Sequence, residues 1–215
     1  MPRAASYVPR RQPSGPSAPG AIDRFLPEAC GPEPLRGEPV TFWAEEGESV
    51  GRADQGSFAG RWVVIPRVLC FLFREDQVLL LQRSPEKKIF PERYNGLGGH
   101  VEPGEDLRTA ARRELAEEAG IPVETLRLAG LITVDTGASP GVLIAVFVGE
   151  ASGEPAGSTP EGTLVWTPIA RVLELPVVED FPALWPRVLR FRETGEPFFL
   201  SYAYDAQDHL IVREG

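Results

Sequence analysis

The sequence is poor in cysteine and histidine. Its two cysteines, Cys30 and Cys70, lie far apart, and only two histidines are present. This set predicts neither a disulfide framework nor a zinc site, and a reducing, cytoplasmic location is expected. The sequence also lacks any run of 18 or more apolar residues, so it predicts no membrane-spanning segment.

Basic residues are outnumbered by acidic ones. With 22 Lys and Arg against 31 Asp and Glu, the formal net charge is −9. Nonspecific binding to nucleic acid polymers needs clustered basic residues that displace counterions from the phosphates, so this class of partner is not expected. An acidic protein can still bind a small phosphate compound through a divalent cation. Small-molecule ligands are therefore the expected partners.

The chain has the composition of a globular protein with one domain and additional segments, at 215 residues, 42% hydrophobic and 25% charged. Residues 1–20 are mostly Pro, Ser, Gly and Ala, and they predict a disordered tail because they cannot bury enough apolar surface. Residues 21–60 are an N-terminal extension whose role is unassigned; it either adds a strand or hairpin or packs on a partner subunit. The folded domain is expected at 61–215.

Alternating apolar stretches predict strands, and two segments have the pattern of helices. The first helix is expected from Glu105–Asp106 to just before Gly120, because acids favour a helix start and glycine favours the position after its end. Strands followed by a helix, more strands and a second helix predict an α/β/α sandwich with a mixed β-sheet. The strands are expected at 61–73, 78–83, 126–134, 142–151, a short one ending at Trp166 and a final hairpin turning at 205–208; the second helix is expected from Glu179 or Asp180 to about Phe191, kinked at Pro186.

One stretch, Tyr94–Ile121, contains a glycine cluster and then three carboxylates on the expected first helix. Glu114, Glu117 and Glu118 stand at i, i+3 and i+4, so they share one helical face. Three carboxylates so placed repel one another unless a positive charge lies between them. A hard cation that prefers oxygen ligands, Mg²⁺ or Mn²⁺, meets this requirement.

The spacing of the fixed residues in this stretch resembles the Nudix box. The resemblance implies the α/β/α sandwich fold and hydrolysis of a nucleoside diphosphate linked to another group, with divalent metal. It covers about residues 61–215, and the box is its most specific part. The matching positions are Gly99, Glu105, Arg113, Glu114, Leu115, Glu117, Glu118, Gly120 and Ile121.

The resemblance also implies roles for individual residues. Glu114, Glu117 and Glu118 are the expected metal ligands and catalytic carboxylates, joined by the backbone carbonyl of Gly98. Glu161 is the candidate for a further carboxylate that completes the metal site or acts as general base; the alternative is an ordinary loop acid. Glu105 and Arg113 are expected to form a structural ion pair, against the alternative of solvated surface charges. Gly99 and Gly120 complete the structural residues of the box.

The sequence YNGLGGHVEPGE resembles the MutT-like 8-oxo-dGTP pyrophosphatases. The resemblance implies that Asn95 hydrogen-bonds a purine, Trp166 stacks on it and Arg83 binds phosphate. The alternatives are that Asn95 is a turn residue, that Trp166 is a core aromatic residue and that Arg83 is a surface arginine. Members that act broadly on oxidised purines have paired Asp residues just after the stacking Trp, where this chain has Pro168 and Ile169. A lesion-reading acid pair is therefore absent or comes from elsewhere.

The expected function is Mg²⁺-dependent hydrolysis of a purine nucleoside triphosphate, with or without an oxidised base, to the monophosphate and pyrophosphate. Two alternatives stay open: hydrolysis of another nucleoside diphosphate derivative such as ADP-ribose, and a nucleotide-binding regulatory module with this fold. His100 and His209 are interpreted as ordinary polar residues. A homodimer is an option that the residues leave open.

Overall fold

The computed structural model describes residues 60–215, apart from 122 and 156. The expectations for the tail at 1–20 and for the extension up to residue 59 lie outside the described residues. No helix in the described part is long and apolar enough to cross a membrane.

Nine strands of the described part form one mixed sheet in the order β6-β7-β2-β1-β5-β4-β8-β9, with β3 paired to β2. The pairs β1–β5 and β4–β8 are parallel, and the other pairs are antiparallel. The mixed sheet and the predicted strands are thus confirmed. The strands are β1 (Val64–Arg74), β2 (Gln77–Arg83), β3 (Tyr94–Asn95), β4 (Val123–Val134), β5 (Gly141–Ala151), β6 (Ser158–Thr159), β7 (Gly162–Pro168), β8 (Phe198–Tyr204) and β9 (Leu210–Glu214).

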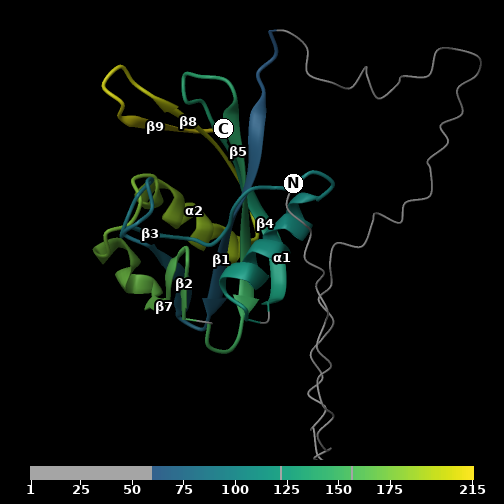
Figure 1. The fold of residues 1–215 in the computed structure, drawn as a ribbon, viewed down its shortest axis with the longest axis vertical. Helices are drawn as coiled ribbons and strands as arrows, with labels where there is room; N and C mark the ends of the chain where they lie inside the picture. Colours follow the sequence, from purple (N-terminus) through teal and green to yellow (C-terminus); the bar gives the residue numbers. More distant parts are fainter. Residues whose placement is uncertain (1–59, 122, 156) are drawn as a thin grey trace, which may run out of the picture. The chain divides into compact units, whose positions relative to one another are not determined.

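Two α-helices cover opposite faces of this sheet, α1 (Leu107–Glu118) and α2 (Phe181–Thr194) (Figure 1). Because side chains alternate along a strand, β1 contributes to both cores. The predicted α/β/α sandwich is therefore confirmed. The α1-side core contains Val68, Cys70 and Leu72 of β1 with Ala111 and Leu115, and the α2-side core contains Phe71 and Phe73 of β1 with Phe181, Leu184 and Trp185.

The helix α1 begins and ends as its sequence predicts. Asp106 caps its N-terminus, and Gly120 follows its end with φ +63°, a conformation that favours glycine. The apolar ridge Ala111, Leu115 and Ala119 is buried against the sheet. The neighbouring helical face, with the three glutamates, is therefore free to line a site.

Replacing Asp106 by alanine is expected to destabilise the fold by about 1 kcal/mol, because its carboxylate accepts hydrogen bonds from Arg108 N (2.8 Å) and Thr109 N (3.0 Å). Its hydrogen bonds with Thr109 and Arg108 lower the pKa of Asp106. A lowered pKa means that the stabilisation is present above about pH 4 and is lost as the pH falls through the folded-state pKa. Urea unfolding at pH 7 and pH 3 measures this difference. Asp106→Asn, which keeps the cap, should lose far less at pH 7.

Two features of the C-terminal half differ from the sequence prediction. The helix α2 continues past Phe191 to Thr194, and Pro186 lies inside it. It ends there because Gly195, at φ +75°, donates its N–H to the carbonyl of Phe191 at 2.8 Å. A 3-10 helix, η2 (Ile169–Glu174), connects β7 to the segment before α2 and was not predicted.

Candidate active site

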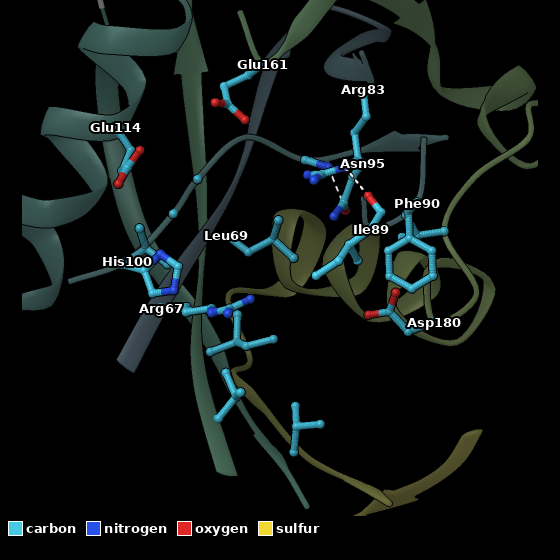
Figure 2. A pocket seen from close by; sticks show the side chains of 18 of the residues that line it. Arg67, Leu69, Arg83, Ile89, Phe90, Asn95, His100, Glu114, Glu161 and Asp180 are labelled. Carbon is cyan, nitrogen blue, oxygen red and sulfur yellow. Dashed lines mark hydrogen bonds between the residues drawn. The ribbon is translucent and has the colours of Figure 1, made fainter. Parts of the chain in front are cut away.

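A cavity of about 700 Å³ collects most of the residues that the sequence singles out. Its walls come from β1, the loop after β2, the glycine loop (residues 96–101), α1, the turn before β7 and the start of α2 (Figure 2). One end is rich in carboxylates, and the other combines apolar side chains with the acids Glu179 and Asp180. The predicted residues that line it are Arg83, Asn95, Gly98, Gly99, Glu114, Glu117, Glu118 and Glu161.

The glycine loop packs directly on β1. Val68 N donates to the carbonyl of Gly99 at 2.9 Å, and Gly98 adopts φ +143°. A Cβ on Gly98 would collide with the carbonyl of Val68, and a Cβ on Gly99 would collide with the carboxylate of Glu114. These two positions therefore require glycine so that the loop fits between the strand and the helix.

Glu118 is the most enclosed of the three box glutamates, with 7% of its surface exposed. Its Oε2 accepts the N–H of Gly98 at 2.9 Å. Burial, together with the negative charges of Glu114 and Glu161, raises the pKa of Glu118 to about 7 despite the opposing effect of the Gly98 bond. The ionised form of Glu118 is therefore costly here unless a cation is present.

Arg113 joins the glycine loop to α1. Its guanidinium forms a bidentate pair with Glu105 (2.8 and 3.0 Å) and donates to the carbonyl of His100 at 2.9 Å. It also contacts Glu114 at 3.0 Å and Glu117 at 3.2 Å. These hydrogen bonds lower the pKa of Glu105 and raise the pKa of Arg113. Arg113 thus orients two of the box carboxylates as well as the loop.

Glu161 reaches the same end of the cavity from the turn before β7. Its Oε1 pairs with Lys87 Nζ at 2.7 Å. Together with the box glutamates it provides only oxygen donors, which is the chemistry that Mg²⁺ and Mn²⁺ prefer. Among residues 60–215, however, no three His, Cys, Asp or Glu side chains are gathered closely enough to hold an ion. These oxygen donors suit the metal in chemistry. A bound cation would also relieve the repulsion between the carboxylates.

Arg83 and Asn95 lie on the opposite wall of the cavity (Figure 2). Arg83 Nε donates to the carbonyl of Ile89 at 3.0 Å, which fixes the loop after β2. Asn95 Oδ1 accepts the N–H of Gly96 at 2.8 Å, a turn contact that leaves the amide NH₂ group available. Both side chains therefore line the cavity, and their roles in phosphate and base binding stay predictions.

Trp166 lies outside the cavity lining. Its ring packs beside the α1-side core and is covered by the Arg74 guanidinium at 4.3 Å, and its Nε1 donates to the carbonyl of Gly153 at 3.3 Å. The apolar end of the cavity is on the other face of the sheet, where Val142 and Ile144 pack with the α2-side core. The stacking role expected for Trp166 does not fit this position.

Two further acids, Glu179 and Asp180, line the cavity and were not predicted as site residues. They come from the start of α2, where the sequence indicates only a helix N-terminus. Burial raises the pKa of Asp180, and the charge of Glu179 raises it further. An acid pair is thus present in the cavity, although not after Trp166. Nothing in the local sequence distinguishes this acid pair from an ordinary helix N-terminus. Only the packing of α2 on the sheet brings the pair to the cavity.

Comparison with known proteins places these features in a family. A family model described as the NUDIX domain matches residues 64–186. An oxidized purine nucleoside triphosphate hydrolase of Danio rerio is 41% identical over 124 residues, 57% of this chain and 75% of that protein. The NAD-capped RNA hydrolase NudC of Chromobacterium violaceum is 43% identical over 70 residues, 31% of this chain and only 26% of NudC.

The fold also matches a solved structure. The MutT protein of Bacillus halodurans aligns with a TM-score of 0.60 at 27% identity, covering 70% of this chain and 97% of that one. The family model covers more than half of the 215 residues, and the box residues Gly99, Glu114, Glu117 and Glu118 line one cavity. The chain therefore belongs to the Nudix family.

Proposed function

We propose that this protein is a Mg²⁺-dependent pyrophosphatase that hydrolyses a purine nucleoside triphosphate, including one with an oxidised base, to the monophosphate and pyrophosphate. The observation that carries the proposal is that one cavity is lined by the box carboxylates and Glu161 at one end and by Glu179 and Asp180 at the other. The Danio rerio relative is named as an oxidized purine nucleoside triphosphate hydrolase, and the similarity to it supports the same substrate class.

At the carboxylate end, Glu114, Glu117, Glu118 and Glu161 would hold the cation. A bound divalent metal neutralises charge on phosphate oxygens and lowers the pKa of a water molecule. Arg113 keeps Glu114 and Glu117 in place through its contacts at 3.0 and 3.2 Å. Glu161 is the candidate to accept the proton of the attacking water, because it lines the cavity from outside α1 and its charge acts on Glu118.

At the other end, Asn95, Glu179 and Asp180 would read the base. A carboxyl group donates a hydrogen bond when protonated and accepts one when ionised, and the raised pKa of Asp180 makes its protonated form less costly. The amide of Asn95 does both. Such a set suits the mixed donors and acceptors on the edge of a purine, and an 8-oxo group changes this pattern.

The test is a substrate panel of 8-oxo-dGTP, dGTP, dCTP, ADP-ribose and a dinucleoside polyphosphate, each with Mg²⁺ and with EDTA. We expect pyrophosphate release from the purine triphosphates and none with EDTA. Turnover of ADP-ribose or the dinucleotide alone would assign another branch of the family. No turnover of any compound would instead favour a nucleotide-binding regulatory module.

A further inference from the structure

Arg67 is a charged residue in a row of β1 side chains that is otherwise apolar. Leu69, Phe71 and Phe73 follow it at every second position and pack with the α2-side core. The strand therefore points Arg67 toward the same face of the sheet, not toward α1. Hydrophobic packing alone does not explain an arginine at this position, because arginine is rarely buried without a partner.

The guanidinium of Arg67 lies in the wall of the cavity (Figure 2). Its Nε is buried and has no hydrogen-bond partner. Within residues 60–215, no side-chain hydrogen bond or ion pair of Arg67 is present. By contrast, Arg83 and Arg113 each donate at least one side-chain N–H to a backbone carbonyl. Arg67 thus lines the ligand space with a positive charge that has no side-chain partner among residues 60–215.

The surroundings of Arg67 connect the two ends of the cavity. Its backbone bridges His100, which directly follows the glycines of the box. On the other side it is level with Ile144 of β5, which lines the apolar part of the cavity with Val142. Arg67 therefore lies between the glycine loop and the apolar wall of the cavity.

We infer that Arg67 binds a phosphate group of the nucleotide that occupies the cavity. The planar fork of a guanidinium matches phosphate oxygens in a bidentate arrangement. An unpaired, partly desolvated cation gains more from an anion than a solvated surface arginine does. The inference rests on the proposed function for the presence of a nucleotide, and it adds a second phosphate-binding arginine to Arg83.

The test measures binding of a ligand that the proposed reaction does not consume. Guanosine and GMP are titrated calorimetrically into the full-length protein with Mg²⁺, for wild type, Arg67→Met and Arg67→Lys. Arg67→Met should weaken GMP binding by about tenfold to a hundredfold and change guanosine binding by less than about twofold. Arg67→Lys keeps the charge without the fork, so its loss should be intermediate.

The control is Arg171→Met, since Arg171 is exposed and, in the described part of the chain, pairs only with Glu174 three residues later; it should leave both affinities unchanged. Equal weakening of guanosine and GMP by Arg67→Met would overturn the inference and make Arg67 a base-pocket residue. Unchanged GMP affinity, or a wild type that binds GMP no better than guanosine, would also overturn it. If GMP binding depends on Arg67 while no triphosphate is hydrolysed, the inference holds and the proposed function fails.

Discussion

Replacing Glu118 by glutamine is expected to lower kcat by about a hundredfold to a thousandfold, the usual cost of removing one group that stabilises charge in a transition state. Glutamine keeps the size of the side chain and still accepts the Gly98 N–H, but it removes the charge. The buried charge of Glu118 is opposed by Glu114 and Glu161. The metal-free variant should therefore be at least as stable as the wild type.

A second readout separates loss of the metal ligand from a change in fold. Mg²⁺ or Mn²⁺ should raise the melting temperature of the wild type, because a ligand of the folded state stabilises it, and this rise should be reduced in Glu118→Gln. The matched control is Glu193→Gln, an exposed glutamate on α2 outside the cavity. Full activity of Glu118→Gln would show that this residue is not a metal ligand.

Replacing Gly98 by alanine is expected to lower both stability and activity. The residue has φ +143°, a region open almost only to glycine, which costs about 1–3 kcal/mol for other residues. The new Cβ would also collide with the carbonyl of Val68. Relief of that collision must move the loop, and a displacement of about 1 Å near reacting groups lowers turnover by about a hundredfold.

Gly104→Ala separates the two causes. Gly104 also has a positive φ, +91°, but a Cβ there would have no atom within 4 Å. This variant should lose stability from the backbone conformation alone and keep its kcat. Denaturant unfolding and steady-state kinetics on both variants measure the comparison. Equal kcat values for Gly98→Ala and Gly104→Ala would contradict the close packing of the glycine loop on β1.

The features that could be predicted from the sequence are local ones. The hairpin of β1 and β2 follows from two apolar runs around a short polar turn. The limits of α1 follow from Asp106 and Gly120, and the shared face of the box glutamates follows from their spacing. Each depends on residues close together in the chain, so periodicity and capping are sufficient to place them.

The features that could not be predicted depend on which face of the sheet a residue occupies and on what packs there. Trp166 lies beside the α1-side core, under Arg74, because of the register of β7 on β2. Glu179 and Asp180 reach the cavity because α2 covers the opposite face. The number of residues between β7 and α2 does not tell on which face of the sheet Trp166, Glu179 and Asp180 lie.

The sequence by itself determined a glycine loop and a helix with three carboxylates on one face, a pattern that predicts a site for a hard cation. Only the tertiary structure decided what surrounds it. Arg67, Asn95 and Asp180 come from separate elements, and strand pairing and helix packing bring them to one cavity. The physical reason is that a one-residue change of strand register would turn Arg67 or Asn95 to the other face, and the position of Asp180 depends on where α2 packs.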